Sequence, residues 1–565
     1  MLPLVLLFLC PPLAWAAFGH VFDVREATID SVHDALFTHS TTCREVVSSF
    51  LARIEHFNPT INAVVSLNPS ALSAADRLDA RIAAGNVTGA LFCIPILLKD
   101  SYDVVGMSTT GGCQGLANNK PPANAPTVKA LEDAGAIILG KTNLHEMALE
   151  GLTVSSLGGQ TVNPYDLTRT PGGSSGGSGA AVAANFAILA TGTDTVNSLR
   201  SPASANSLFS FRPTRGLISR AGVIPVSFTQ DTVGAMARTP RDLAVALTVM
   251  ASVGFDARDN ATELPPSEVR HRDYSASLYG GTLKGLRLGL LNGFFNHTAS
   301  AETTPVNNIM ANMVSKLSAA GAEMVNITDP LYDALAIAKL DVQAFEYREL
   351  LDAYLAAATT ATTSNDGPRP TSFSKLYSNN SNNNTNFLVI PAQYSFIKRA
   401  SHSSTSDAAY LETLNRIQDL TRTLEATFAT NNLDALIYPQ QKNLVVKLGS
   451  PSQSGRNGIL AALTGYPVVC VPAGFFSPSA DDDDDDDDDA PRLASGGVPV
   501  GMEIFGRPWS EHRLLNMARH ISELVPVRRM PPFANGTVES KVYDSVPSIT
   551  PDLDSIPAVY PLGVF

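Results

Sequence analysis

The stretch that most constrains this chain spans residues 171–202 and reads PGGSSGGSGAAVAANFAILATGTDTVNSLRSP. Two pairs of glycines enclose two adjacent serines, an alanine-rich segment follows, and a Thr/Asp turn then leads to a third serine, Ser198. Paired glycines let one backbone approach another closely and expose amide N–H groups. The stretch therefore predicts a tightly packed site at which oxygen atoms react.

Two known kinds of loop fit this stretch poorly. A phosphate-binding loop of the GxxxxGK[ST] type needs a lysine after its second glycine, and none stands there. A nucleophile elbow, G-x-S-x-G, matches twice, centred on Ser174 or on Ser175. An elbow follows a hydrophobic strand, whereas residues 163–171, NPYDLTRTP, are turn-forming. A Ser-His-Asp hydrolase that uses this elbow, with His512 or His520 as its base, stays an alternative.

The same stretch resembles the amidase signature family. The family pattern GGSSGGS…GTDTGGSIR is followed here as GGSSGGSG…GTDTVNSLR, and the family strand that ends in a lysine is matched by residues 92–100, FCIPILLKD. Further segments match in the same order along the chain, namely residues 140–143, 211–216, 231–234 and 497–501. The resemblance covers residues 25–255 and 430–520.

The resemblance implies a hydrolase of amide C–N bonds that forms an acyl-enzyme through a Ser-Ser-Lys triad. In this chain Ser198 matches the nucleophile, Ser174 the bridging serine and Lys99 the base. A lysine titrates near pH 10.4, so a base that works near neutrality needs a pKa lowered by about 3 units. Burial behind the apolar strand at residues 91–98 acts in that direction. No cofactor is implied.

The resemblance also implies donors for an oxyanion and side chains that support the reactive groups. The donors are the backbone N–H groups of Thr195, Val196, Asn197 and Ser198, and the supporting side chains are those of Ser175, Asp194 and Arg200. The two glycines that the family places before the nucleophile are Val196 and Asn197 here. Asparagine tolerates a left-handed backbone and valine does so poorly. A catalytically weak or inactive binding protein with an amidase fold is therefore the alternative function.

The pattern of strands and helices predicts an α/β protein. A strand at 91–98, a helix at 127–135 and a strand at 136–140 alternate in the way that gives parallel sheets covered by helices. We expect a single large domain with a mixed, largely parallel central sheet and helices on both faces, the amidase signature fold. Helices are also predicted at 43–56, ended by Asn58-Pro59, and at 141–149.

We expect the amidase domain to cover residues 17–530, with a tail at 531–565. No Pro/Gly/Ser-rich linker or internal repeat divides this region. A helical and loop excursion at about 256–400 is expected to shape the substrate pocket, and the aspartate run at 481–489 is expected to form a solvated loop.

The first residues predict export. Residues 1–16 are apolar and end in small residues at Ala14 and Ala16, which indicates a signal peptide cleaved after Ala16. N-x-[ST] sequons mark candidate glycosylation sites. They lie at Asn86, Asn260, Asn296, Asn326, Asn379, Asn383 and Asn535. The sequence thus predicts a glycoprotein that is secreted or held in the secretory-pathway lumen.

The cysteines predict no metal site. Four remain after cleavage, Cys43, Cys93, Cys113 and Cys470, and no C-x-x-C or Cys/His spacing indicates a metal. These cysteines are enough for one or two disulfides, and the sequence does not specify how they pair. A buried thiol in the core is an equal alternative for Cys93.

The charge of the chain narrows its partners. The net charge is −13, of which the run at 481–489 supplies −9, so the rest carries −13 + 9 = −4. An acidic chain with no basic face argues against nucleic acid, and no later apolar run is long enough for stable membrane insertion. The resemblance implies a small-molecule or peptide amide as the partner, and residues 158–165, GGQTVNPY, look more like the peptide-amidase branch than like the tRNA amidotransferases. The oligomeric state is left open.

Overall fold

The computed structural model describes residues 22–357, 369–377, 387–388, 391–477, 496–539, 541–560 and 562–563. The predicted signal peptide, the aspartate run at 481–489 and the sequons at Asn379 and Asn383 lie outside these residues.

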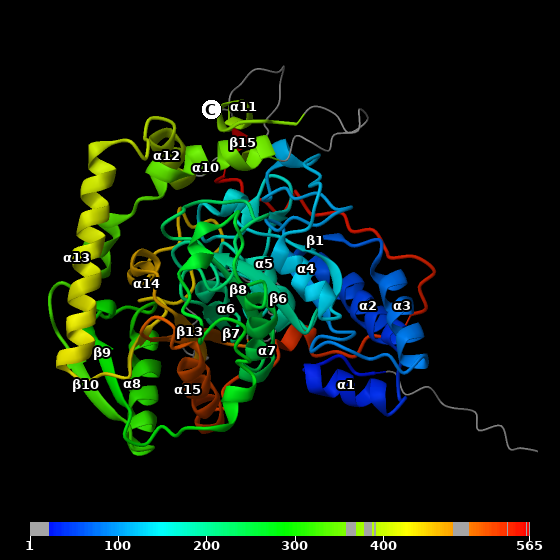
Figure 1. Ribbon diagram of the computed structural model, residues 1–565, viewed down its shortest axis with the longest axis horizontal. Helices are drawn as coiled ribbons and strands as arrows, with labels where there is room; N and C mark the ends of the chain where they lie inside the picture. The colour runs from blue at the N-terminus through cyan, green and yellow to red at the C-terminus, as the bar shows by residue number, and fades with distance from the viewer. Residues whose placement is uncertain are drawn as a thin grey trace, which may run out of the picture.

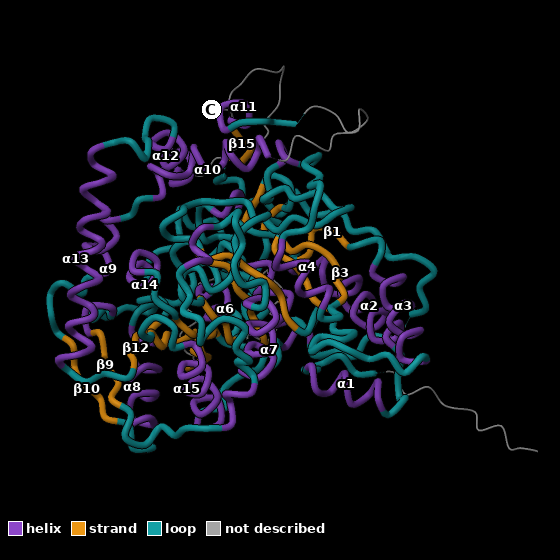
Figure 2. Tube along the Cα trace, in the orientation of Figure 1, coloured by secondary structure: helices purple, strands orange, loops and turns teal. Residues whose placement is uncertain are grey.

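One 11-stranded sheet runs through the molecule (Figure 2), in the order β1-β3-β2-β6-β8-β7-β13-β14-β12-β9-β10. Its strands are β1 Val64–Leu67, β2 Pro95–Lys99, β3 Ile137–Thr142, β6 Leu189–Asp194, β7 Phe209–Arg212, β8 Thr232–Ala237, β9 Arg287–Leu291, β10 Glu323–Ile327, β12 Ala435–Pro439, β13 Val468–Phe476 and β14 Val498–Phe505. Short two-stranded pairs are formed by β4 Val154–Ser155 with β5 Gly159–Gln160 and by β11 Phe387–Leu388 with β15 Leu562–Gly563.

The sheet is mixed, as expected, but parallel pairing does not predominate in it. Of the ten neighbouring pairs, four are parallel and six are antiparallel. Crossover helices give parallel neighbours only where a strand-helix-strand unit occurs, as in β2-α4-β3 and β9-α8-β10. The successive strands β7 and β8, whose connection is described throughout and contains no helix, pair antiparallel, and β13 and β14 also pair antiparallel.

Helices cover the sheet (Figure 1), with α1, α2 and α3 at one end, α13 along the other, and α10, α11 and α12 together at the top of the view. The helices are α1 Ile29–Phe37, α2 Cys43–Ile61, α3 Ala71–Ala83, α4 Pro126–Asp133, α5 Gly176–Ala183, α6 Arg200–Ala205, α7 Pro240–Ala251, α8 Thr304–Ala319, α9 Ala334–Ile337, α10 Gln343–Ala357, α11 Phe373–Tyr377, α12 Pro391–Ala400, α13 Ala408–Thr430, α14 Ile459–Thr464 and α15 Glu511–Leu524.

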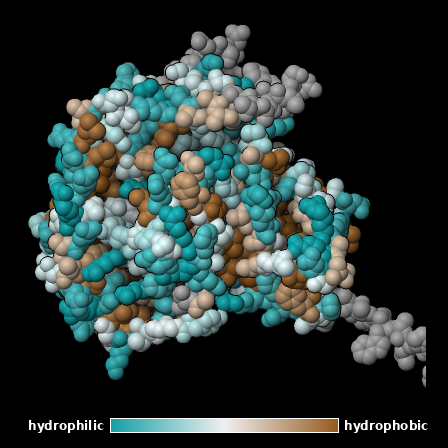
Figure 3. Space-filling view, viewed as in Figure 1, coloured by the Kyte–Doolittle hydropathy of each residue, from teal (hydrophilic) through white to brown (hydrophobic). Residues whose placement is uncertain are grey.

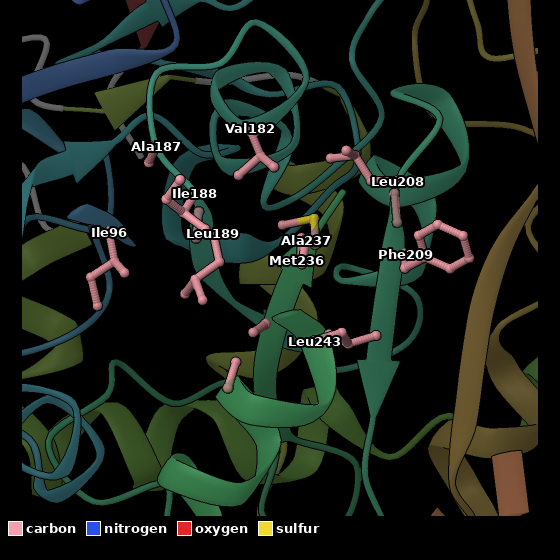
Figure 4. Packing of buried hydrophobic residues seen from close by; sticks show 14 of the residues in the cluster. Ile96, Val182, Ala187, Ile188, Leu189, Leu208, Phe209, Met236, Ala237 and Leu243 are labelled. Atoms are coloured by element: carbon pink, nitrogen blue, oxygen red, sulfur yellow. The ribbon is translucent and has the colours of Figure 1, made fainter. Parts of the chain in front are cut away.

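The core lies where the central strands meet α5 and α7. Figure 4 shows Ile96 of β2, Leu189 of β6 and Met236 of β8 near Val182 of α5 and Leu243 of α7, and each is at most 1% exposed. Every residue of α5 is buried. Apolar surface removed from water contributes roughly 25 cal/mol per Å², so this layer fixes the strand ends that carry the polar residues described below.

Two predicted helices differ from those in the structure. Helix α2 has the Thr42 and Glu45 capping box at its start but continues through Pro59 to Ile61. The Asn58 side chain, which accepts hydrogen bonds from Ala63 N–H and Val64 N–H, bonds the chain beyond the helix. Residues 141–149 are not one helix, because β3 extends to Thr142 and only a 3-10 turn, Glu146–Ala148, follows.

The surface of the molecule is mixed in polarity. In Figure 3 apolar residues are scattered among hydrophilic ones on the face in view. Within the described ranges no helix combines the length and the apolar character needed to cross a membrane.

Candidate active site

Lys99 is the last residue of β2 and its side chain is fully buried, with 0% exposure. Its Nζ donates to Ser174 Oγ at 2.7 Å and to Thr193 Oγ1 at 2.7 Å. Burial lowers the pKa of Lys99 to about 7, although the carboxylates of Asp194 and Asp231 act in the opposite direction. A buried amine with this pKa is largely uncharged just above neutrality, so it can accept a proton.

Ser174 and Ser175 stand immediately before α5, and both are fully buried. The peptide bond between Gly173 and Ser174 is cis. The Ser175 hydroxyl lies 3.3 Å from both Thr193 N and Thr193 O, and Ser175 N–H donates to Ser198 O at 3.3 Å. The paired-serine segment is therefore tied to the end of β6 and to the loop that carries Ser198.

The glycines of this segment permit a close approach between backbones. A Cβ on Gly177 would lie 2.3 Å from Asn143 O and 2.7 Å from Ala63 O. Real Cβ atoms do not come that near to backbone oxygen, so the start of α5 can press against β3 and the end of α2 only with glycine at this position.

Ser198 lies in the loop between β6 and α6 and is 7% exposed. It lines a cavity of about 500 Å³, which we call the Ser198 pocket. The β6–α6 loop, which carries Ser198, also supplies Thr195, Val196 and Asn197 to the wall of this pocket. The excursion supplies Ala334, Leu335, Ala338, Asp341, Gln343, Phe396 and Arg399 to the same wall. The polar end of the pocket includes Glu150 and Arg456, which form an ion pair at 3.3 Å.

The backbone from Val196 to Ser198 presents unused donors. Within the residues that the structure describes, the N–H groups of Val196, Asn197 and Ser198 have no hydrogen-bond acceptor. Neither Val196 nor Asn197 has a positive φ. The turn therefore forms without the left-handed backbone that glycine would have provided, and valine at position 196 is not strained by it.

A buried charge network holds this turn. Asp194 accepts from Leu199 N–H at 3.0 Å, from Arg200 at 3.1 Å and from Arg212 at 2.7 Å, and all three side chains that carry charge are fully buried. Arg200 also pairs with Glu503 of β14 at 2.7 Å and donates to Val196 O. Burial raises the pKa of Asp194, but the two guanidinium groups outweigh this and hold it at about 2. The two guanidinium groups and the two carboxylates thus compensate one another's charge inside the protein.

Other members of the network had no role assigned from the sequence. Thr193 holds the Lys99 amine, Asp231 accepts from Thr195 Oγ1 at 2.6 Å, and Glu503 and Arg212 complete the charge network. Thr193 stands inside the GTDT motif and Asp231 inside a matched segment, so the sequence marked their segments. Only the folded arrangement shows their partners.

The histidines do not form a triad with the paired serines. His512 contacts Arg272 and His520 contacts Gly280 O. His145 is closer, because its backbone N–H donates to Ser174 O at 2.9 Å, but its ring Nε2 lies 3.1 Å from Gln393 Oε1. No histidine ring in the described chain is hydrogen-bonded to Ser174 or Ser175. The described residues also contain no group of three or more His, Cys, Asp or Glu side chains arranged to hold a metal ion.

Cys43 and Cys93 form a disulfide that joins the start of α2 to the segment before β2, whereas Cys113 and Cys470 are buried and lie outside this bridge. The core-thiol alternative for Cys93 was therefore wrong. Of the sequon asparagines that the structure describes, Asn86, Asn260, Asn326 and Asn535 are exposed and Asn296 is half-buried.

Comparisons with known proteins find relatives along most of the chain. The amidase family profile matches residues 45–515. The A subunit of a glutamyl-tRNA(Gln) amidotransferase from Alkalilimnicola ehrlichii is 32% identical over 538 residues, which cover 90% of this chain and 99% of that relative.

Solved structures with a similar fold are found as well. The peptide amidase PAM in complex with the competitive inhibitor chymostatin is 31% identical, with a TM-score of 0.77 over 90% of this chain and 100% of that one. The native peptide amidase from Stenotrophomonas maltophilia is 30% identical, with a TM-score of 0.73 over 90% of this chain and 98% of that one.

Proposed function

We propose that this chain, which belongs to the amidase family, cleaves a small-molecule or peptide carboxamide through an acyl-enzyme on Ser198. It is a hydrolase that acts on amide C–N bonds. The observation that carries the proposal is the buried Lys99 amine, 2.7 Å from Ser174 Oγ, beside the loop that presents Ser198.

The first half of the reaction uses Lys99 as the base. The uncharged amine takes the proton of Ser174 while Ser174 takes that of Ser198, and Ser198 Oγ attacks the amide carbon. The C=O bond opens to an oxyanion. When it re-forms, the C–N bond breaks, and the proton returns through Ser174 to the leaving nitrogen. An amine leaves and an acyl-Ser198 ester remains.

Water completes the cycle by the same relay. It gives a proton toward Lys99 through Ser174, adds to the ester carbon and releases a carboxylic acid, and Ser198 regains its proton. The unused N–H groups of Val196, Asn197 and Ser198 are suited to binding the oxyanion in both halves. One such donor is typically worth about 2.7–4 kcal/mol in the transition state.

The role of Arg200 in this scheme is positional. By holding Val196 O, Arg200 fixes the plane of the 196–197 peptide, so the Asn197 N–H points away from the charge network. Asp194, paired with Arg200 and Arg212, keeps the whole turn in place.

The Ser198 pocket supports an amide of moderate size. Its apolar wall includes Leu335, Phe396 and Ile459, and its charged residues include an acid-base pair, Glu150 and Arg456. A volume of about 500 Å³ is within the usual range for small-ligand sites. The peptide amidases at 30–31% identity favour a peptide amide among the candidate substrates.

Export of the protein is part of the proposal. The Cys43–Cys93 disulfide is expected in an oxidising compartment, and the exposed sequons are accessible to glycosylation. Together with the apolar residues 1–16, they support a secreted or lumenal glycoprotein.

A fluorophosphonate probe, followed by hydrolysis of amide substrates, tests the chemistry. We expect the wild type to be labelled on Ser198, and Ser198→Ala, Ser174→Ala and Lys99→Ala to lose turnover by about 10²–10⁴-fold or more. Ser73→Ala, on the exposed face of α3, is the control and should match the wild type. Wild-type turnover by Ser198→Ala would reject the proposal.

The inactive amidase-fold binding protein makes the opposite prediction. It should show neither labelling of Ser198 nor a burst of leaving group with any activated ester. The absence of a positive φ at Val196 and Asn197 favours the active enzyme over this alternative.

A further inference from the structure

A second cavity, distinct from the Ser198 pocket, also borders the β6–α6 loop. It measures about 310 Å³ and is lined by residues at the ends of β6 and β8, by the 220–228 and 257–260 segments, and by α10. We call it the Phe228 pocket, after the half-exposed aromatic residue in its wall. We propose that it is a second ligand site, for a small, uncharged, mainly apolar molecule.

The Phe228 pocket is separate from the Ser198 pocket, although Thr195 lines both. One face of α10 passes both cavities, with Gln343 at the Ser198 pocket and Leu350 and Tyr354 at the Phe228 pocket. Glu346, on the turn between them, is buried and accepts hydrogen bonds from the Ser227 hydroxyl and from Thr229 N–H. This contact lies between the two sets of lining residues that α10 contributes.

The charges in the wall are already paired, and this sets the class of ligand. Arg220 forms an ion pair with Asp259 at 2.6 Å. Asp231 accepts from Thr195 Oγ1 at 2.6 Å, from Val226 N–H at 2.8 Å and from Ser227 N–H at 2.9 Å. An ionic ligand would lose its water without gaining a free counter-charge, which is costly.

Most of the remaining lining is apolar, namely Ala221, Val223, Ile224, Pro225, Val226, Val233 and Leu350, with the Phe228 ring. Hydroxyl and amide groups in the wall come from Thr193, Thr195, Ser227, Thr232, Asn260 and Tyr354. Apolar walls around a cavity near 300 Å³ fit one aromatic ring or a short alkyl chain. A hydroxyl or carbonyl on the ligand could still contact Thr232 at the wall.

The position of this cavity links it to catalysis. Thr193, whose hydroxyl is 2.7 Å from the Lys99 amine, is one of its lining residues. A ligand in the Phe228 pocket is therefore separated from the proposed base by one side chain, that of Thr193.

Two exposed alanines give a matched test. Ala257 lies in the wall of the Phe228 pocket and Ala338 in the wall of the Ser198 pocket, and both are exposed, so tryptophan at either position narrows one cavity without disturbing the core. Binding of 4-fluorobenzyl alcohol is followed by fluorine NMR of the ligand, with 4-fluorobenzoate as the charged counterpart. Thermal unfolding checks that each variant is folded.

We expect the alcohol to bind the wild type and Ala338→Trp equally. It should bind Ala257→Trp at least about tenfold more weakly, a loss of about 1.4 kcal/mol in binding free energy. The benzoate should bind the wild type at least about tenfold more weakly than the alcohol. Leu350→Trp, which fills the cavity from α10, should repeat the Ala257→Trp result. No binding of the alcohol, loss on Ala338→Trp instead, or equal binding of the benzoate would each overturn the proposal. Because binding alone is measured, the answer does not depend on whether Ser198 is a nucleophile.

Discussion

Burial lowers the pKa of Lys99 to about 7 from its usual 10.5, and this shift has consequences for rate and for stability. The amine can act as a base only when it has lost its proton. Asp194 and Asp231 both favour the protonated form, so the value is a balance between burial and two carboxylates.

We therefore expect kcat/KM to rise about tenfold per pH unit below about 7 and to level off above it. Asp231→Asn removes one carboxylate that favours the ammonium form of Lys99 and so lowers the Lys99 pKa. The acidic limb of the pH profile of kcat/KM should therefore move to lower pH in this variant. Steady-state kinetics from pH 5 to pH 9 check this, and a limb that moves to higher pH in Asp231→Asn would contradict the assignment of Lys99 as the base.

The same shift predicts how stability depends on pH. The folded state loses the Lys99 proton near pH 7, whereas the unfolded chain keeps it until about 10.5. Between these values the unfolded state binds one more proton, so the free energy of unfolding gains about 1.4 kcal/mol per pH unit from this group. Lys99→Met lacks this gain.

The measurement is the difference in unfolding free energy between wild type and Lys99→Met at pH 7.5 and pH 8.5. We expect the wild type to gain unfolding free energy relative to Lys99→Met as the pH rises. Lys129→Met is the control, because Lys129 is an exposed residue paired with Asp133, and its curve should run parallel to that of the wild type. A constant difference for Lys99→Met would show that the buried amine keeps its proton.

At the scale of elements, the β6–α6 loop is held by strands that are distant in sequence. Glu503 of β14 reaches Arg200, which in turn reaches Asp194 and Val196 O. We expect Glu503→Gln to lower the free energy of unfolding by about 3–5 kcal/mol, because it leaves a buried guanidinium with less than its full counter-charge. Chemical denaturation measures this loss. Exposed Glu323→Gln, which breaks a surface pair with Arg287, should cost less than about 1 kcal/mol.

The disulfide joins two further elements, α2 and the segment that leads into β2. It closes a loop with a sequence separation of 50 residues. Chain entropy then predicts that Cys43→Ser/Cys93→Ser loses about 4 kcal/mol of stability. Cys113→Ser, which replaces a buried cysteine outside the bridge, is the comparison. Equal stability of the double variant and the wild type under oxidising conditions would mean that the bridge does not form in solution.

At the scale of the whole molecule, glycosylation tests export. We expect intact and peptide mass spectrometry of protein secreted from a eukaryotic host to find glycans at Asn86, Asn260, Asn326 and Asn535, which are exposed. Half-buried Asn296 should carry less. Absence of residues 1–16 from the secreted chain would mark the cleavage. Protein that stays inside the host without glycans would contradict this part of the proposal.

The sequence predicted the local parts of this molecule better than the long-range ones. Strand β2 ending at Lys99 and the start of α2 at Cys43 follow from neighbouring residues, and both are present. The balance of parallel and antiparallel strands depends on which strands meet across the sheet, so it was not predictable from local alternation. The partner of Cys93 and the contact of Thr193 with Lys99 likewise join residues 50 and 94 positions apart.

The proposed reactive groups and a large part of the wall around them come from different parts of the chain. Lys99, Ser174 and Ser198 belong to the first half of the sheet and its loops, whereas Ala334, Leu335, Phe396 and Arg399 arrive from the later excursion. The choice of substrate and the chemical step thus depend in part on different segments of the chain. Exchanging the excursion for that of another amidase should redirect the preference for one amide over another while the chemical step itself is kept.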